Sequence, residues 1–334
     1  ESPAMRGLLS KLKCDSYTLL VAASSIIRPG VAKSGMMKEY IRRHYNPENF
    51  EYLHEAFREQ LQETYGVMVY QEDVIKIAHH FGGLDLGESD VLRRIMSGKK
   101  KRGDRFEELQ EKFFRNCDER GYPRKLSNEV WRQIESFAGY SFCKAHSASF
   151  AVESFQSLYL KTYYPLEFMV AVINNFGGFY HTEIYIHEAR MAGATIEPPC
   201  VNNSHYLTSI QGTTIYLGFI HLKDMEQETA ETIATERQRK GCYHSFADFI
   251  YRTGLGKEQL NILIRIGALR FTDHTKKELL WSKNLYLADQ KPVVAMLPEV
   301  GNMALEEESL PALEDQPYEK AFEEIDLLGF PLVD

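Results

Sequence analysis

Helical periodicity, broken repeatedly by glycine, is the feature that most restricts the fold of this 334-residue chain. In the first half, apolar residues recur at spacings of three or four, which is the period of an amphipathic helix. Glycines such as Gly66, Gly98 and Gly121 separate the periodic segments. The pattern predicts helices over residues 36–43, 49–63, 71–80, 89–96, 104–120 and 127–137.

The second half keeps the helical pattern and adds short extended segments. A long helix is expected over residues 147–164, with Pro165 ending it and opening the next helix. Residues 213–219 are expected to form a strand. Residues 217–239 and 246–269 have the pattern of two helix-hairpin-helix units, in which a hairpin presents backbone N–H groups to a DNA phosphate. The sequence therefore predicts a mainly α fold, in which a multi-helix domain precedes a small α domain with short β segments.

The composition is that of a folded protein that does not cross a membrane. Hydrophobic residues make up 44% of the chain and charged residues 26%, which is enough apolar material for a sizeable core and argues against disorder of the whole chain. The most apolar stretches, residues 19–27 and 168–173, fall short of the roughly 18 residues that span a bilayer. The chain begins with Glu1 and shows no signal-peptide pattern, so we expect a cytoplasmic protein of which this chain is a piece.

The five cysteines do not have the spacing of a metal site. No two of them form a C-x-x-C pair, and no H-E-x-x-H motif is present. Because their number is odd, a disulfide framework is not expected either. The cysteines therefore favour a reducing compartment.

Charge is distributed unevenly along the chain, although the formal net charge is -8. Residues 291–334 hold two basic residues against eleven acidic ones, and we expect them to form a solvated linker or tail. Residues 93–125 hold twelve basic residues against six acidic ones. Such a basic run is either a solvated face or a patch that contacts phosphates, and composition does not separate the two interpretations.

Lys144, His146, Ser147 and Ser149 lie together where the long helix is expected to begin. Free backbone N–H groups and the helix dipole favour an anion at a helix N-terminus. In the alternative interpretation, Ser147 caps the helix, and Lys144 and His146 are ordinary loop residues. The local pattern alone favours this second interpretation.

Several long motifs resemble a known protein family. They are LQETYGVMVYQEDVIKIA at residues 61–78, SDVLRRIMSGKKK at residues 89–101, a run that begins ESFAGYSFCKAHSAS at residue 135, and IDLLGFPL at residues 325–332. Taken in this order, they resemble the alpha subunits of bacterial DNA polymerase III, the C-family of DNA polymerases. The resemblance covers nearly the whole chain and implies the fingers of that family, followed by tandem helix-hairpin-helix elements.

The resemblance implies four regions. They are the C-terminal edge of the palm over residues 1–30, the fingers over residues 31–205, the helix-hairpin-helix region over residues 206–285 and the acidic linker or tail over residues 286–334. In this family, palm aspartates that partly form an Asp-x-Asp pair hold the Mg²⁺ ions for nucleotidyl transfer. This chain contains no Asp-x-Asp pair. We therefore expect no catalytic or metal-binding residue within it, Mg²⁺ ligands outside it, and no primer extension by the chain alone.

The resemblance also implies roles for basic residues, because a triphosphate gathers negative charge in the transition state. The residues expected to bind the dNTP triphosphate are Arg28, Arg93, Arg94, Lys144, His146 and Ser147. The residues expected to contact the backbone of the primer–template DNA are Lys99, Lys100, Lys101 and Arg102.

Two motifs depart from the family pattern. N-K-S-H-S is replaced by C-K-A-H-S at residues 143–147, so that Cys143 and Ala145 replace two side chains that form hydrogen bonds. The first hairpin reads K-G-V-G-E in the family and K-D-M-E-Q here, at residues 223–227. It has lost both glycines, which reach positive φ without strain, and has gained two carboxylates. This hairpin could therefore be structural and not bind DNA.

The expected partners are primer–template DNA, dNTP and other holoenzyme subunits, including the sliding clamp, the last mostly through regions outside this chain. One alternative is a non-catalytic module that binds DNA or partner subunits through the basic run and the hairpins. Another is a helical scaffold whose acidic tail recruits basic partners. The polymerase hypothesis predicts that Lys144→Ala weakens dNTP contact. The module hypothesis predicts that only charge reversal at residues 99–101 matters.

Overall fold

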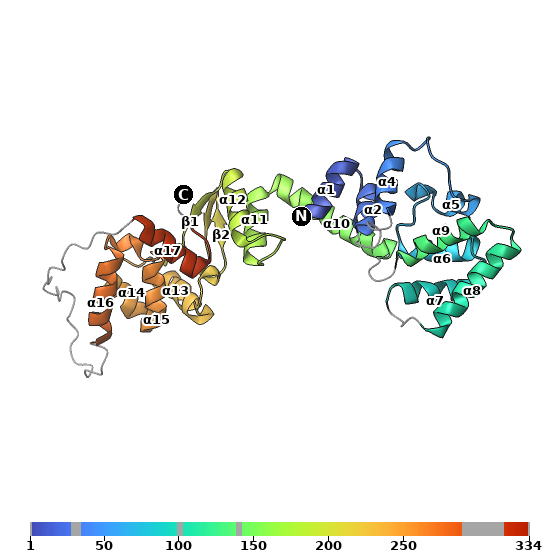
Figure 1. Ribbon diagram of the computed structural model, residues 1–334. Coiled ribbons are helices and arrows are strands. Elements are labelled where there is room, and N and C mark those ends of the chain that lie inside the picture. Colours follow the sequence, from blue (N-terminus) through green and yellow to red (C-terminus); the bar gives the residue numbers. More distant parts are fainter. Residues whose placement is uncertain (1, 28–34, 99–102, 138–141, 289–316, 333–334) are drawn as a thin grey trace. The chain divides into compact units, whose positions relative to one another are not determined.

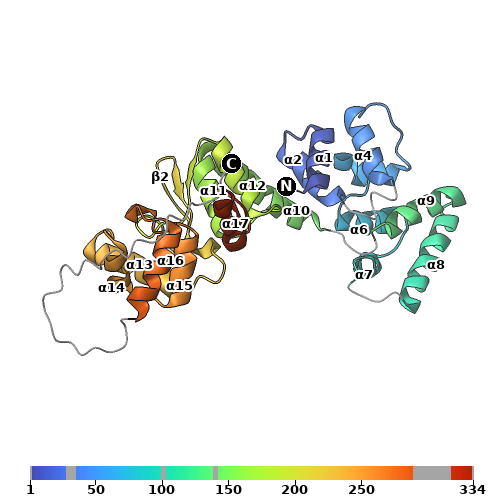
Figure 2. The ribbon, with the colours of Figure 1, turned by 60° about the vertical axis from the view of Figure 1, so that its left-hand side comes forward.

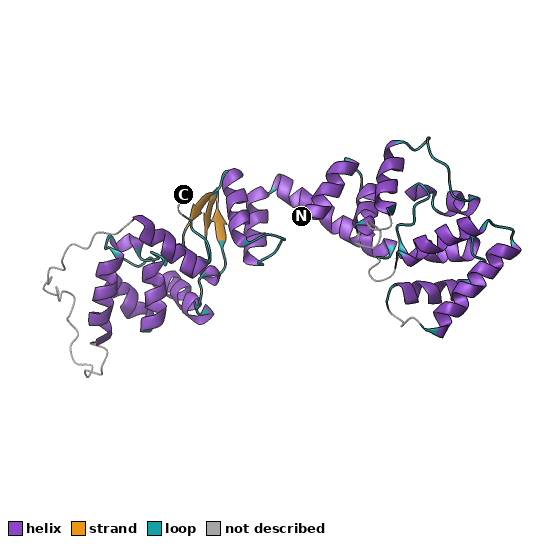
Figure 3. Cartoon of the chain, viewed as in Figure 1, coloured by secondary structure: helices purple, strands orange, loops and turns teal. Residues whose placement is uncertain are grey.

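The computed structural model describes residues 2–27, 35–98, 103–137, 142–288 and 317–332. The predicted mainly α fold is confirmed, and a small three-stranded sheet is the only β structure among these residues (Figure 3). The chain divides into two compact units, Glu1–Tyr159 and Leu160–Asp334, and the boundary falls inside helix α10. The boundaries expected for the palm edge, fingers, hairpin region and tail stay a prediction.

In its described residues, the first unit contains helices and no strand. Its described elements are α1 (Pro3–Leu12), α2 (Tyr17–Ile26), α4 (Met36–Tyr45), α5 (Glu55–Gln60), the 3-10 helix η1 (Gln62–Thr64), α6 (Gln71–His80), α7 (Leu86–Met96), α8 (Asp104–Glu119), α9 (Arg124–Glu135) and the start of α10 (Lys144–Tyr163). Figures 1 and 2 both show α8 and α9 side by side, and α8 also contacts α7.

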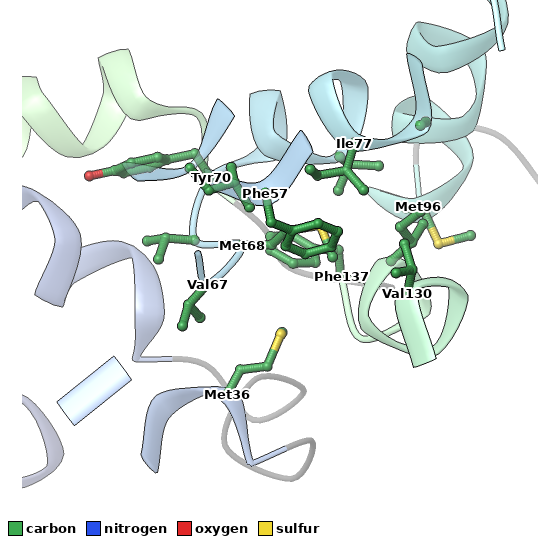
Figure 4. Close-up of a cluster of buried hydrophobic side chains, with 14 of the residues drawn as sticks. Met36, Phe57, Val67, Met68, Tyr70, Ile77, Met96, Val130 and Phe137 are labelled. Atoms are coloured by element: carbon green, nitrogen blue, oxygen red, sulfur yellow. The ribbon is translucent and has the colours of Figure 1, made fainter. Parts of the chain in front are cut away.

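One continuous hydrophobic core holds these helices together. Phe57, Met68, Ile77 and Phe137 are almost fully buried in it and pack against one another (Figure 4). The core also includes Ala151 of α10. It therefore anchors α6 and the first half of α10, and the start of α10 is where the sequence predicts an anion site.

Most of the predicted helices of this unit are present. Helix α6 has the predicted bounds, and α4, α7, α8 and α9 lie within three residues of theirs. Residues 49–63 were expected to be one helix, but only Glu55–Gln60 and a single 3-10 turn are helical. The reason is local: the His54 side chain accepts a hydrogen bond from the Ala56 backbone N–H, and this cap starts the helix six residues late.

The second unit combines helices with the small sheet. Its elements are the end of α10, α11 (Pro165–Asn174), α12 (Thr182–Met191), β1 (Thr195–Glu197), β2 (Ser209–Gln211), β3 (Thr214–Tyr216), η2 (Phe219–His221), α13 (Gln227–Lys240), α14 (Phe246–Thr253), α15 (Lys257–Arg265), η3 (Arg270–Thr272), α16 (Lys276–Ala288) and α17 (Pro317–Leu328). Strand β3 confirms the predicted strand. It lies in the middle of the sheet, parallel to β1 and antiparallel to β2.

Two buried clusters hold this unit together. One cluster packs α11 and α12 against the sheet, with Met169, Tyr185 and Ile215 at its centre. The other cluster lies among α13, α14, α15 and α16, which Figures 1 and 2 both show as one group. The second cluster fixes the two hairpins, because each hairpin joins elements that contribute to it.

The closing segment differs from the tail that the charge pattern suggested. Residues 317–328 form α17, and the side chains of Leu327, Phe330 and Leu332 are buried in the two clusters of the second unit. The buried carboxylate of Glu324 accepts a hydrogen bond from the Leu332 N–H at 2.6 Å. The acidic residues 306–308 lie outside the described residues. Across the described parts of the chain, no helix combines the length and apolar character needed to cross a membrane.

Candidate nucleotide and DNA interface

The start of α10 is held against the start of α6. The backbone N–H of Gln71 donates to the carbonyl oxygen of Phe142 at 3.2 Å. In return, the backbone N–H of Lys144 donates to a carboxylate oxygen of Glu72 at 3.1 Å. A carboxylate therefore occupies the N-terminus of α10, which is the place that helix N–H groups and the helix dipole prepare for an anion.

The Lys144 ammonium lies over this junction. Its Nζ atom is 2.6 Å from a carboxylate oxygen of Glu63 and 5.5 Å from the centroid of the Tyr70 ring. The side chain is 48% exposed, so the ion pair is open to water and to a competing anion. Such exposed pairs contribute only about 0–1 kcal/mol, so a phosphate could replace the Glu63 carboxylate at small cost.

Tyr70 and Asp73 are buried residues at the start of α6, next to the junction. The buried Asp73 carboxylate accepts hydrogen bonds from the N–H groups of Val69 and Tyr70, both at 2.8 Å, and burial raises its pKa to about 6. Burial also raises the pKa of the Tyr70 phenol, so the hydroxyl stays protonated. Figure 4 shows the Tyr70 ring extending away from the core cluster. Within the described residues, its buried hydroxyl has no hydrogen-bond partner.

Arg93 reaches the same junction from α7. Its Nη1 atom donates to the side-chain oxygen of Gln71 at 2.9 Å, and its Nε and Nη2 atoms donate to Asp90 at 2.9 and 2.7 Å. Arg94 also pairs with Asp90, at 2.7 Å. The hydrogen bond from Arg93 holds the pKa of Asp90 below its usual range. The Arg93 side chain and the Lys144 backbone N–H therefore contact two adjacent residues, Gln71 and Glu72, while the Lys144 ammonium pairs with Glu63.

Ser147 does not cap α10, because the helix begins three residues earlier than expected, at Lys144. Ser147 is 2% exposed, and its hydroxyl forms a hydrogen bond with the hydroxyl of Ser25 on α2. The Tyr17 hydroxyl also donates to the carbonyl oxygen of Ala148 at 2.9 Å. This face of α10 is therefore its packing face, and Ser147 lies away from the exposed part of the junction.

His146 is exposed and lies between two phenylalanine rings. Its ring centroid is 4.9 Å from that of Phe142 and 4.7 Å from that of Phe150. Its backbone N–H points to the Cys143 sulfur at 3.4 Å. The motif cysteine thus takes part in the helix start even though it replaces the family's asparagine.

Five of the sequence-predicted site residues lie outside the described residues. They are Arg28, Lys99, Lys100, Lys101 and Arg102. Four residues at the junction were not found from the sequence: Glu63, Glu72, Gln71 and Tyr70. The contacts that bring them to Lys144 and Arg93 join residues 22 to 81 positions apart, and no local pattern reveals such contacts.

The second hairpin has the geometry of an anion site. It joins α14 to α15 through Gly254, Leu255 and Gly256. Gly254 adopts a φ of 61°, in the left-handed region that glycine reaches without strain. Gly256 precedes α15 with no side-chain cap, which leaves the first N–H groups of this helix open to a ligand.

The first hairpin is closed by a side chain instead. Asp224 adopts a φ of 61° without being glycine. Gln259 of α15 accepts from the Glu226 N–H at 3.1 Å and donates to the Asp224 carbonyl at 3.0 Å. A cleft of about 440 Å³ runs between the two hairpins, and the carboxylates of Glu226 and Glu228 line its first-hairpin side. Glu258 and Lys257 of α15 line the same cleft, so the second hairpin differs from the first in its two glycines and its cation, and not in freedom from carboxylates.

The cysteines and acidic residues form no recognisable metal centre. All five cysteines have free thiols. Among the residues that the structure describes, no group of three or more His, Cys, Asp or Glu side chains could hold a metal ion. The acidic residues of the junction are engaged otherwise: Glu63 with Lys144, Glu72 with the α10 N-terminus, and Asp90 with two arginines. They do not fit a Mg²⁺ site.

A helical fold with two helix-hairpin-helix elements is typical of the class of proteins that bind nucleic-acid phosphates. A family model described as the bacterial DNA polymerase III alpha subunit finger domain matches residues 1–121, and a helix-hairpin-helix motif matches residues 193–279. The chain is similar to the finger and helix-hairpin-helix regions of bacterial DNA polymerase III alpha subunits.

Individual relatives agree with this similarity. The DNA polymerase III subunit alpha of Aquifex aeolicus is 36% identical over 284 residues, which cover 84% of this chain and 24% of the relative. The subunit of the same name from Thermus aquaticus is 32% identical over 350 residues, which cover 100% of this chain and 28% of the relative. The chain thus spans about a quarter of the length of these relatives.

Proposed function

We propose that this chain is the finger segment of a DNA-directed DNA polymerase, and that it binds the triphosphate of the incoming dNTP where α6 and α10 begin. The observation that supports this proposal is that the Arg93 side chain, the first backbone N–H of α10 and the exposed Lys144 ammonium contact Gln71, Glu72 and Glu63, respectively, at one junction. Fixed cations and backbone N–H groups stabilise the charge that a triphosphate gathers during nucleotidyl transfer.

The carboxylates of Glu72 and Glu63 stand where phosphate oxygens of the nucleotide would lie. Glu72 accepts the first N–H of α10, and Glu63 pairs with the Lys144 ammonium. Each of the two glutamates offers one negative charge. A triphosphate offers several charges and more acceptor oxygens to the same donors. On binding, the nucleotide displaces the two carboxylates, and Arg94 and His146 border the same site. Ser147 acts through its bond to Ser25, by fixing the helix. Arg28 completes the triphosphate set by resemblance.

Mg²⁺ is held outside this chain, by carboxylates of the palm. The pairing of the acidic residues at the junction and the absence of an Asp-x-Asp pair in the sequence support this part of the proposal. The metal would supply charge neutralisation and activation of the primer hydroxyl. The chain alone therefore does not extend a primer.

Primer–template DNA is bound electrostatically. The second hairpin offers open helix N–H groups and Lys257, and residues 99–102 are proposed to contact the DNA backbone as predicted from the sequence. The first hairpin serves to position the second through Gln259. Other holoenzyme subunits, including the sliding clamp, bind mostly elsewhere on the full-length protein, which works in the cytoplasm.

Steady-state kinetics of the full-length polymerase test this proposal. Arg93→Ala and Lys144→Ala should each raise KM for dNTP at least tenfold and leave KM for the primer–template within twofold. Lys161→Ala is the matched control, because Lys161 is an equally exposed lysine of α10 that pairs with Glu188 at 2.7 Å. If the two site variants raise only KM for DNA, the segment is a DNA-binding module without a triphosphate site.

A further inference from the structure

Phe176, which follows α11, combines an unfavourable backbone conformation with an exposed ring. Its backbone N–H donates to the carbonyl oxygen of Ile173 at 3.2 Å, and the N–H of Gly177 donates to that of Val172 at 3.0 Å. These two bonds form a Schellman motif, in which the residue at the position of Phe176 is left-handed and is usually glycine. Phe176 has a φ of 48°, which a bulky residue reaches only with strain.

Packing does not explain why a phenylalanine occupies this position. Phe176 is 59% exposed, and its ring meets the edge of the His221 ring at a centroid distance of 5.4 Å. Glycine would fit the backbone better and would leave no apolar side chain in water. A residue that costs the fold free energy on both counts points to a role outside the fold.

More exposed apolar side chains lie on the same anchored loop and on the segment tied to it. The Asn174 side chain donates to the Thr208 carbonyl oxygen at 2.8 Å and accepts from the Thr208 N–H at 2.7 Å, which ties the end of α11 to the segment before β2. Leu207, next to Thr208, is 48% exposed, and Phe179 is 58% exposed. We call Phe176, Phe179 and Leu207 the loop patch.

The charge of the two segments selects the kind of partner. Residues 168–182 and 198–223 contain no Asp or Glu, although the 334-residue chain holds 47 of them. The exposed titratable residues of the two segments include His181, His205 and Lys223. Lys223 also begins the first hairpin, so these segments continue into the region that matches a helix-hairpin-helix motif. Exposed aromatic rings without carboxylates suit a polyanion that carries flat bases.

We propose that the loop patch binds unpaired bases of single-stranded DNA, with Phe176 as the stacking platform. This inference rests on the DNA binding proposed above and adds a site for the single-stranded part of the template. A duplex keeps its bases stacked on one another, whereas an unpaired base offers a π face to an aromatic ring. Because the patch itself carries no cation, its contribution should depend little on salt.

The test uses the full-length polymerase with Phe176→Gly. Fluorescence anisotropy measures the Kd of a labelled oligo(dT) and of a labelled blunt duplex at several salt concentrations. Loss of the stacking partner should raise the Kd of oligo(dT) about five- to hundredfold, by the same factor at each salt concentration. The Kd of the blunt duplex should stay unchanged. Phe176→Tyr keeps the ring and should bind oligo(dT) as the wild type does.

Glycine suits the backbone at position 176, so the variant should keep the local fold. Amide hydrogen exchange at the end of α11 measures this, and it should stay as slow as in the wild type. Phe322→Ala is the matched control, because Phe322 is 66% exposed in the same unit but has Glu319 and Glu323 close to it in α17. This control should leave both Kd values unchanged.

The inference is overturned if Phe176→Gly leaves oligo(dT) binding unchanged, as expected of a surface that docks a protein. It is also overturned if the affinities for oligo(dT) and duplex fall together, if Phe322→Ala acts alike, or if exchange at the end of α11 accelerates in Phe176→Gly. Failure of the proposed duplex contact gives a separate result. In that case Lys257→Glu leaves duplex binding unchanged, while oligo(dT) binding still depends on Phe176.

Discussion

His221 is a buried histidine that holds the second unit together as a neutral ring. Its Nε2 atom lies 2.9 Å from the Thr208 hydroxyl, which accepts from the Gly218 N–H at 3.0 Å. Burial lowers the pKa of His221 to about 4, below its ordinary value of 6.5. The fold therefore binds its proton less readily than the unfolded chain does. The stability from this group is complete above pH 6.5 and is lost as the pH falls toward 4.

At pH 5 this loss should amount to about 2 kcal/mol of unfolding free energy. Urea unfolding of the chain at pH 7 and pH 5 measures it, with His221→Gln as the control that cannot titrate. We expect the wild type to lose about 2 kcal/mol more than the variant between the two pH values. Equal losses would show that His221 is charged in the fold or does not govern this pH range.

The sequence correctly predicted that Lys144 and His146 lie at the start of a helix, but it did not predict that Ser147 is buried. The family motif and the expected helix start point to all three residues. However, the helix begins three residues earlier than expected, and each residue along a helix turns the side chain by about 100°. This shift turns Ser147 from a capping position toward α2, where it is buried.

The second hairpin is the element that should carry DNA contact in the second unit. Lys257, at the first position of α15, adds a cation to the open helix N–H groups. Lys257→Glu in the full-length polymerase should weaken binding to primer–template DNA and reduce the slope of log affinity against log salt by about one. Fluorescence anisotropy at several salt concentrations measures both quantities.

Lys240→Glu is the matched control, because Lys240 lies at the end of α13, outside the second hairpin between α14 and α15. It should leave the slope unchanged. Glu226→Gln should strengthen binding, since it removes a carboxylate from the cleft between the hairpins. If Lys257→Glu and Lys240→Glu act alike, the second hairpin is not a DNA contact.

The existence of most elements could be predicted from apolar spacing, and hairpin geometry could not. Helix α6 has the predicted bounds because its apolar residues face a single core. The loss of glycine from the first hairpin suggested a changed backbone, yet Asp224 still adopts a positive φ. Aspartate tolerates this conformation, and the two bonds from Gln259 stabilise it. The Gln259 side chain comes from α15, and the local sequence of the first hairpin does not reveal this contact.

At the scale of the whole chain, charge composition gave a less complete account of the structure than apolar content. Residues 317–332 are acidic, which suggested a solvated tail, but Leu327, Phe330 and Leu332 bury themselves in the second unit. Three apolar side chains at a few kcal/mol each outweigh the cost of placing this acidic segment against the second unit. Arg265 and Lys276 reduce that cost further by pairing with Glu323.

Photo-crosslinking of the full-length polymerase tests the central claim most directly. A dNTP analogue with an aryl azide on its γ-phosphate is bound to the polymerase on primer–template DNA and irradiated, and the labelled peptides are mapped with and without excess unmodified dNTP. The account predicts competable labelling near the start of α10 or in α7, around Lys144 and Arg93. Competable labelling found only outside residues 1–163 would contradict it, because the triphosphate would then lie in another part of the protein.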